Sequence, residues 1–417
     1  MSFCEVKNMI KRFRIFAAFA ILLTTLSTGC QKETPTVSLS IWTSAGEQEV
    51  MEEMIEAFKK KYADDAQFEI TISKEDEKTC RDTVLSDPKG AADLYTFASD
   101  QFDDLQRENA LLPITDQTDQ IIAENGGEDS AAIQSSSKDG TLYAYPLVAS
   151  NGYFMYYNSS YFTEKDVESF DAMLTIAAKK GKKVAMDYSS GWYIYSFFKG
   201  AGLDVEMNED GITNTCNWNE TSTPHTGVDV ANAMLAIARH PGFINCTDED
   251  FIKGVKDGTI IAGINGAWNA STIEEAYGEH YNAAKLPTYT LGGKQVQMHS
   301  FAGYKLLGIN AHTKNPQWAM RLATWLTNEE NQTTRFRKRG EGPSNIKAAA
   351  SREVQSSPAI KALGEQAKYS HLQHVAESFW TPTFKFGTTI AGGNRDGADL
   401  QKLLDTLTKE VASKPKK

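Results

Sequence analysis

Alternating strand and helix patterns restrict the fold of this chain more than any other sequence feature. VSLSIW at 37–42 alternates apolar and polar residues as a strand does, and EVMEEMIEAFKKKY at 49–62 carries the apolar stripe of an amphipathic helix. FEITI at 68–72 and ADLYTFA at 92–98 predict two further strands. Strands and helices in this succession predict an α/β fold with a mainly parallel sheet.

The same alternation restarts in the middle of the chain. KKVAMDY at 182–188 and GTIIAGING at 258–266 predict strands, and GVDVANAMLAIARH at 227–240 predicts a helix. Apolar stripes predict two more helices, at 316–327 and 400–411. Two such α/β runs in a chain of this length predict two lobes.

Residues 1–29 have the layout of an export signal. Basic residues are followed by an apolar run at 15–23, which is far shorter than the roughly 20 residues of a spanning helix. The border LSTGCQ resembles a bacterial lipobox, although Ser27 stands where that motif usually has leucine. The resemblance implies that Cys30 becomes the lipid-carrying first residue and that 30–36 form a linker. A soluble secreted protein cut nearby is the alternative.

Charge and cysteine content limit the partners and the covalent scaffold. Residues 1–29 hold four basic and one acidic side chain, so 39 basic and 53 acidic side chains remain, a formal net charge of −14. This charge disfavours nucleic acid and anionic lipid surfaces as partners. Cys216 and Cys246 either pair or stay free thiols, and the role of Cys80 is open.

Signatures of enzymes are missing from the sequence. The chain contains no GxSxG, P-loop or HExxH motif, no GxGxxG after a strand and no CxxC pair. HLQH at 371–374 places two histidines three residues apart on a predicted helix, but lacks the glutamate of a zinc protease. We therefore expect neither a metal nor a cofactor.

Aromatic residues instead follow several of the predicted strands. The carboxyl ends of strands line the ligand crevice of open α/β sheets. A flat ring suits the apolar C–H face of a sugar, whose hydroxyl groups bond to nearby carboxylates and amides. The competing interpretation is that such rings fill the core. The rings concerned are Trp42, Phe97, Trp192, Tyr193, Trp268 and Trp380.

Seven segments occur in the order typical of one protein family: LSIWTSAGEQ, AADLYTFASDQFDDLQRENALLPI, GTLYAYPLVASNGYFMYYN, TIIAGINGAWNAS, KLPTYTLGGKQ, SFAGYKLLGIN and RGEGPSNIKAA. With them the chain resembles, over 37–412, the extracellular solute-binding proteins of ABC sugar importers, of the maltose and maltodextrin-binding type. The resemblance implies a two-lobe periplasmic-binding-protein fold with a hinge and a ligand cleft. The first lobe would comprise 37–148 and 302–344, and the second 149–301 and 345–412.

The resemblance also implies a set of ligand contacts, of which Trp268 and Trp380 match the family most specifically. Two departures, Gly191 for a glutamate and Gln101 for an arginine, argue against maltose itself, as does the lack of a glutamate beside Ser150. Three of the contacts have structural alternatives: Glu47 as a charge in the first turn of its helix, Asp100 as a helix cap and Tyr193 as a core ring. The implied contacts are Glu47, Phe97, Asp100, Asn151, Tyr193, Trp268 and Trp380.

Together these features predict a lipid-anchored binding protein on the extracellular face of the bacterial membrane. The protein would act as a monomer. It would capture an oligosaccharide, close its lobes around the sugar and deliver it to the permease of an ABC importer, without catalysing a reaction. A secreted glycoside hydrolase is the alternative. Such an enzyme needs two carboxyl groups about 5 to 10 Å apart, and the sequence indicates no such pair. The sugar, its linkage and the permease are left open.

Overall fold

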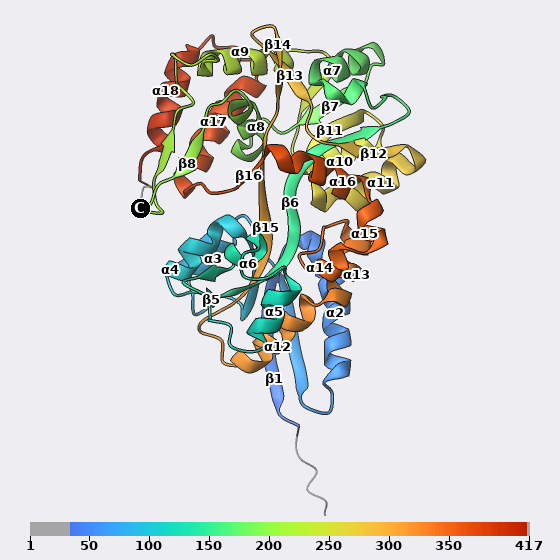
Figure 1. The fold of residues 1–417 in the computed structure, drawn as a ribbon, viewed down its shortest axis with the longest axis vertical. Coiled ribbons are helices and arrows are strands. Elements are labelled where there is room, and N and C mark those ends of the chain that lie inside the picture. The colour runs from blue at the N-terminus through green and yellow to red at the C-terminus, as the bar shows by residue number, and fades with distance from the viewer. Residues whose placement is uncertain (1–33, 415–417) are drawn as a thin grey trace, which may run out of the picture.

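The structure is a computed structural model and describes residues 34–414. Figure 1 shows two lobes stacked along the long axis, with the strands β6 (Ala144–Asn158) and β15 (Ser300–Ile309) passing from one to the other. The described chain begins at the far end of the lower lobe, and its C-terminal end lies in the upper lobe. Cys30 lies outside the described residues.

The predicted strands and helices occur, with ends shifted by a few residues, except for the helix expected at 371–374. Before β6 the chain forms β1 (Thr36–Thr43), α2 (Gln48–Lys61), β2 (Gln67–Lys74), α3 (Cys80–Ser86), β3 (Leu94–Ala98), α4 (Phe102–Arg107), α5 (Thr118–Glu124), α6 (Ala131–Gln134), β4 (Ser137–Lys138) and β5 (Thr141–Leu142). Between β6 and β11 lie α7 (Phe170–Lys179), β7 (Lys183–Met186), α8 (Gly191–Gly200), β8 (Val205–Met207), β9 (Asn214–Cys216), α9 (Gly227–Ala238), β10 (Phe243–Asn245) and α10 (Asp248–Lys256).

The remaining elements complete both lobes. From β11 to β15 the chain forms β11 (Ile260–Gly266), α11 (Ala270–Tyr277), β12 (Tyr281–Ala284), β13 (Thr288–Leu291) and β14 (Lys294–Gln297). After β15 come α12 (Pro316–Leu326), α13 (Glu329–Arg339), α14 (Ile346–Ala349), α15 (Arg352–Ser356), α16 (Pro358–Gln366), β16 (Ser370–Leu372), α17 (Trp380–Ala391) and α18 (Leu400–Val411).

The main sheet is mixed rather than mainly parallel. Its strands follow the order β10-β7-β11-β6-β15-β3-β1-β2, with β12 added to β6 and β16 to β15. β1 pairs in parallel with β2 and β3, and β7 with β10 and β11. β6 and β15 run antiparallel to each other and to their outer neighbours β11 and β3. The parallel prediction is wrong at the centre because these two strands carry the chain between the lobes in opposite directions.

Buried apolar side chains divide into two groups along the chain. Two clusters draw on residues 37–145 and 306–326, and two others on residues 153–301 and 359–411. The proposed lobe boundaries at 148/149 and 301/302 fall inside β6 and β15, where the chain stays in one hydrogen-bonded sheet. Two shared strands therefore connect the lobes at these points, rather than a flexible linker.

Several smaller features of the fold bear on the sequence analysis. HLQH begins in strand β16, which pairs with β15, so the helix predicted there is wrong. Cys80, Cys216 and Cys246 are free thiols. Among residues 34–414, no helix combines the length and apolarity needed to cross a bilayer. The same residues contain no group of three or more His, Cys, Asp or Glu side chains suited to a metal ion.

Candidate functional site

Two tryptophans from separate elements meet in the second lobe. Trp192 lies in the first turn of α8, and Trp268 lies in a 3-10 turn directly after β11. Their ring centroids are 5.5 Å apart, with 36° between the ring planes, and both side chains are half-buried. Trp268 Nε1 donates to Asp248 Oδ2 at 2.9 Å, and Trp192 Nε1 donates to Gln373 Oε1 at 2.7 Å. With both N–H groups bonded, the indoles are held in place with part of their surface open.

Tyrosines lie beneath this pair. Tyr153 of β6 donates its hydroxyl to the Trp192 carbonyl at 2.8 Å, and its ring centroid lies 5.1 Å from that of Tyr193. Tyr193 is buried, and its hydroxyl has no hydrogen-bond partner among residues 34–414. Burial and nearby carboxylates, Asp248 first, raise the pKa of Tyr193 well above its usual value, so the hydroxyl keeps its proton. A polar ligand that reached Tyr193 would supply the missing partner.

Charged side chains face Trp268 from the other lobe. The Lys305 ammonium lies 5.9 Å from the centroid of the Trp268 ring, 2.7 Å from Glu341 Oε1 and 3.7 Å from Glu77 Oε1. Burial alone would lower the pKa of Lys305, but attraction to Glu341, Glu77 and Glu47 outweighs it and raises that pKa above its usual range. Lys305 is therefore a charged ammonium in the interior between the lobes.

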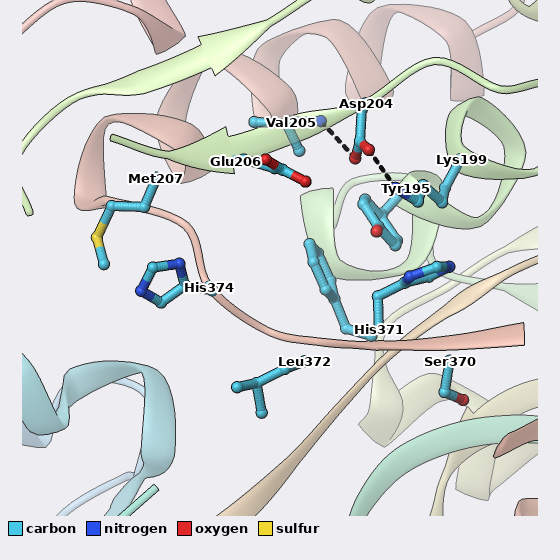
Figure 2. Close-up of a pocket in the computed structure, with 11 residues that line it drawn as sticks. Tyr195, Lys199, Asp204, Val205, Glu206, Met207, Ser370, His371, Leu372 and His374 are labelled. Carbon is cyan, nitrogen blue, oxygen red and sulfur yellow. Dashed lines mark hydrogen bonds and ion pairs between the residues drawn. The ribbon is translucent and has the colours of Figure 1, made fainter. Parts of the chain in front are cut away.

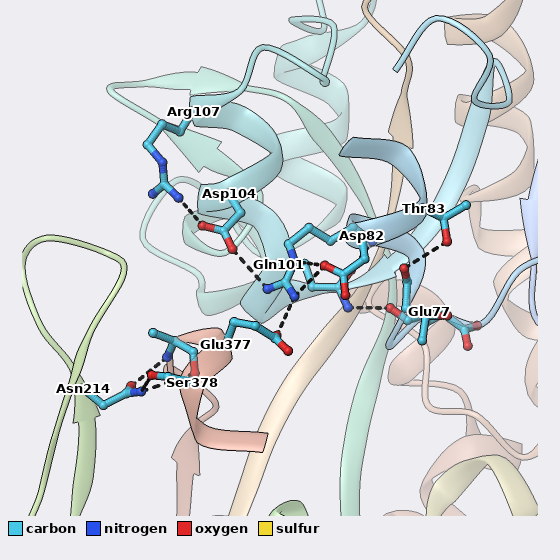
Figure 3. Close-up of polar contacts among 12 residues, drawn as sticks. Glu77, Asp82, Thr83, Gln101, Asp104, Arg107, Asn214, Glu377 and Ser378 are labelled. Carbon is cyan, nitrogen blue, oxygen red and sulfur yellow. Dashed lines mark hydrogen bonds and ion pairs between the residues drawn. The ribbon is translucent and has the colours of Figure 1, made fainter. Parts of the chain in front are cut away.

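An ion-pair cluster joins the lobes directly (Figure 3). Arg81 of α3 contacts Glu377 Oε2 at 2.5 Å, Asp82 Oδ1 at 2.8 Å and Asp104 Oδ2 at 3.1 Å. Glu377 belongs to the second lobe, next to the core residue Phe379, whereas the other three belong to the first. The two walls of the site thus touch in this conformation, and the contact would have to break if the lobes opened.

Asp100 and Asn151 lie close to the crossing strands. Asp100 is half-buried in a 3-10 turn between β3 and α4. Gln101, not Asp100, occupies the N-cap of α4, so the capping alternative for Asp100 is wrong. Burial, together with the charge of Glu377, raises the pKa of Asp100 to about 6, although Gln373 and Arg81 act to lower it. Asn151 is half-buried on β6, opposite Gly303 of β15.

Replacing Asp100 with asparagine is expected to stabilise the ligand-free protein above pH 6. The folded pKa, about 6, exceeds the ordinary value of 3.8, so folding favours the protonated acid and the wild type loses stability as pH rises between these values. The gain should vanish below about pH 4. Urea unfolding at pH 4 and pH 7.5 measures it. As a control, Asp104→Asn removes a partner of Arg81 and should not stabilise the protein. A destabilised Asp100→Asn protein at pH 7.5 would contradict the prediction.

Two predicted contacts are core residues instead. Glu47 is 1% exposed, and its carboxylate accepts from Arg335 Nε at 2.8 Å and Arg339 Nε at 3.1 Å. It therefore forms a buried ion pair at the N-terminal end of α2 and is not exposed to a ligand in this structure. Phe97 is 0% exposed, because β3 lies between β1 and β15 and its inward ring packs in an apolar cluster. In this structure Phe97 offers no ring face to a ligand.

The other predicted tryptophan has a different ring neighbour from the Trp192–Trp268 pair. Trp380 is half-buried at the start of α17, and its ring packs against Phe379 with centroids 5.0 Å apart. No ring contact joins it to Trp192 or Trp268 among the described residues. Ligand contacts by Trp380, Asp100, Asn151, Tyr193 and Trp268 remain predictions.

The two departures from the maltose binders have structural reasons. A Cβ on Gly191 would lie 2.1 Å from Thr383 Oγ1, because the start of α8 packs closely on α17, so no larger residue fits there. Gln101 is buried; its Oε1 accepts from the Arg81 backbone N–H at 3.0 Å and its Nε2 donates to the Glu77 carbonyl at 2.7 Å. Both positions therefore support the fold around the site.

A separate pocket of about 530 Å³ opens in the second lobe between α8, β8 and β16 (Figure 2). The side chains of Tyr195 and Phe301 are almost fully buried, and their rings stack with the centroids 3.7 Å apart. Lys199 pairs with Asp204. None of the predicted ligand contacts lines it. The lining comprises Tyr195, Lys199, Asp204, Val205, Glu206, Met207, Phe301, Ser370, His371, Leu372 and His374.

Sequence reasoning missed four side chains of the site. Trp192 is among the rings that follow the predicted strands, but the family resemblance implies no ligand contact there. Asp248 follows the helix cap Thr247, which makes it look like an ordinary first-turn acid. Gln373 sits inside the misassigned HLQH segment. Lys305 did carry a signal, because a lysine inside the apolar strand GYKLLGI is unusual unless it is paired.

Comparisons with known proteins agree with this architecture. A family profile described as bacterial extracellular solute-binding protein matches residues 53–362. A galactooligosaccharide-binding protein of Bacillus subtilis is 25% identical over 435 positions, covering 98% of this chain and 99% of the relative. The maltodextrin-binding protein MdxE of that organism is 25% identical over 346 positions, covering 76% and 77%.

Solved structures extend the likeness to the fold. A structure with bound acarbose has a TM-score of 0.78 at 27% identity, covering 90% of this chain and 99% of its own. The ligand-free maltodextrin-binding protein MalE1 of L. casei BL23 has a TM-score of 0.72 at 24% identity, covering 91% and 99%. The predicted two-lobe α/β fold with a ligand cleft between the lobes is confirmed. The chain belongs to the bacterial extracellular solute-binding proteins.

Proposed function

We propose that this protein is a lipid-anchored, monomeric substrate-binding protein that captures an oligosaccharide and delivers it to the permease of an ABC importer. The observation that carries the proposal is the Trp192–Trp268 pair, whose indole N–H groups are held by Gln373 and Asp248. Two relatives are named for galactooligosaccharide and maltodextrin binding, which supports an oligosaccharide built from galactose or glucose.

The chemistry of the site matches the two-sided character of a sugar. Half-buried indole rings suit the apolar C–H face. The unpartnered hydroxyl of Tyr193 and the side chains of Asp100 and Lys305 suit the hydroxyl groups. These groups come from both lobes, so a ligand bound between them would favour the closed state.

The direct test is a thermal-shift and calorimetric panel of neutral oligosaccharides, including maltotriose and β-1,4-linked galactotriose. A ligand that binds only the folded protein stabilises it by about 2.7 kcal/mol at a concentration of 100 times Kd. We expect at least one such sugar to raise Tm in a concentration-dependent way. A panel in which no oligosaccharide binds would overturn the proposal.

The bound sugar is expected to stay intact while the protein compacts around it. A binder closes because the ligand contacts both lobes, whereas a glycoside hydrolase would shorten the chain. Small-angle scattering should show a smaller radius of gyration with the bound sugar. Chromatography after prolonged incubation should recover that sugar at full length. Steady release of shorter sugars would favour the hydrolase instead, and binding without compaction would refute closure.

Replacing Cys30 with serine is expected to release the protein from the membrane. The basic, apolar and small-residue order ending in STGC motivates lipid attachment at this thiol. Fractionation of bacteria that express each form measures the change, with Cys80→Ser as the control that keeps the membrane location. Intact mass should show a mature chain that begins at Cys30 and carries lipid; a lipid-free mature chain that begins elsewhere would contradict the prediction.

A further inference from the structure

A buried lysine stands in an apolar strand at the centre of the molecule. Lys305 lies in β15 before the buried residues Leu306 and Leu307, and is itself 7% exposed. Transferring an ammonium from water to such a site costs several kcal/mol unless partners compensate. Its position pairs with Ala98 of β3 on one side and Val148 of β6 on the other, so the strand holds it at the crossing between the lobes.

The hydrogen bonds of this lysine and its partners are incomplete. An ammonium has three N–H donors. One is used by Glu341 Oε1 at 2.7 Å, while Glu77 Oε1 at 3.7 Å is beyond hydrogen-bond distance. Glu77 Oε1 and Glu341 Oε2 are buried, and neither has a hydrogen-bond partner among residues 34–414. Two donors and two acceptors therefore lie close together with their bonding capacity unused.

These unused groups lie beside the tryptophan from the opposite lobe. Lys305 Nζ is 5.9 Å from the Trp268 ring centroid, and the Trp268 N–H is already bonded to Asp248. Glu341 is 2% exposed, so bulk water does not satisfy its second oxygen. Each unsatisfied buried polar group costs about 1 to 3 kcal/mol. A ligand that supplies partners here would recover that cost.

We infer that Lys305, Glu341 and Glu77 form a hydrogen-bonding subsite for adjacent hydroxyl groups of the sugar unit that stacks on Trp268. A hydroxyl accepts from the ammonium and donates to a carboxylate, so a vicinal pair matches the two donors and two acceptors. Arg339 also lies 4.0 Å from Glu341 Oε1, so the carboxylates of the subsite are balanced by nearby cations and the open donors and acceptors suit a neutral sugar. The inference rests on the proposed function, whose own test is whether the parent protein binds a sugar.

The experiment removes both members of the closest ion pair of the subsite, Lys305 and Glu341. The probe is whichever of maltotriose and β-1,4-linked galactotriose the parent protein binds more tightly. Lys305→Met combined with Glu341→Gln removes one charge of each sign and keeps the side-chain lengths similar. Because hydrogen bonds to charged groups are worth about 1.5 to 3 kcal/mol, we expect binding to weaken roughly 10- to 100-fold by calorimetry. The single variant Lys305→Arg keeps a cation at this position and should therefore bind the probe more tightly than the double variant.

The matched control removes an ion pair outside the site. Lys199→Met combined with Asp204→Asn acts in the pocket of Figure 2, where Lys199 and Asp204 pair. This protein should bind the probe as tightly as the parent. Circular dichroism and urea unfolding confirm that both double variants are folded. A Lys305→Met, Glu341→Gln protein that is folded and keeps parental affinity would overturn the subsite while leaving sugar binding intact.

A double-mutant cycle with Trp268→Ala separates a contact to the stacked sugar unit from a general effect. If Lys305 binds the unit that Trp268 stacks, its loss should cost less than threefold once Trp268 is gone. Full additivity of the two losses would place Lys305 at another part of the ligand and refute the subsite. A parent protein that binds neither probe nor any other sugar would instead refute the proposed function.

Discussion

Trp268→Ala is expected to weaken oligosaccharide binding by roughly 10- to 100-fold, since a stacked ring contributes about 1 to 3 kcal/mol and each 1.4 kcal/mol is tenfold in affinity. The ring is half-buried next to Trp192, with its N–H bonded to Asp248. Removing it should leave the fold intact, because the buried core of the lobe does not depend on it. Calorimetric titration with the best sugar of the panel measures the loss.

Two further variants sharpen this prediction. Trp380→Ala tests the second predicted stacking ring, which contacts Phe379 rather than Trp192 or Trp268. Trp318→Ala is the matched control, because Trp318 is also half-buried but lies in the aromatic cluster of α2, β2 and α12 in the first lobe. It should lose stability and keep affinity. Parental affinity in both Trp268→Ala and Trp380→Ala would show that the ring assignment is wrong.

Glu47→Gln is expected to destabilise the protein by about 3 to 5 kcal/mol, the usual cost of breaking a buried ion pair from one side. Burial raises the pKa of Glu47, but the attraction of Arg335, Lys305 and Arg339 outweighs it and holds that pKa well below its usual value. Arg335 is 1% exposed and would lose its carboxylate partner. Urea unfolding at pH 7 measures the change.

The same pair gives a dependence on pH with a defined sign. Because the folded pKa of Glu47 is lowered, its stabilising contribution is complete above the unfolded value of about 4.5 and is lost as pH falls below that value. Wild type and Glu47→Gln should therefore converge in stability in acid. Folded Glu47→Gln protein should bind sugar like the parent. A stable variant that has lost sugar binding would restore the cleft contact that the structure does not support.

The predicted site residues differ in how well local sequence could place them. Trp268 follows β11 directly, so the rule that strand ends line a crevice is enough to select it as a candidate ligand contact. The rule failed for Phe97, because it says where a strand ends and not which face of the strand is covered. Asp100 could be selected from the sequence, but its raised pKa depends on burial that only the folded protein provides.

The sequence by itself determined most of the secondary structure, the α/β class and the two-lobe plan, because apolar periodicity is a local property that each segment carries with it. Tertiary structure decided which distant residues meet. Glu47 and Arg335 are 288 positions apart, and Arg81 and Glu377 are 296 apart. Lys305 of β15 lies near Trp268, which follows β11, although β6 separates these two strands in the sheet. Such pairs depend on strand order and burial, which no local pattern encodes.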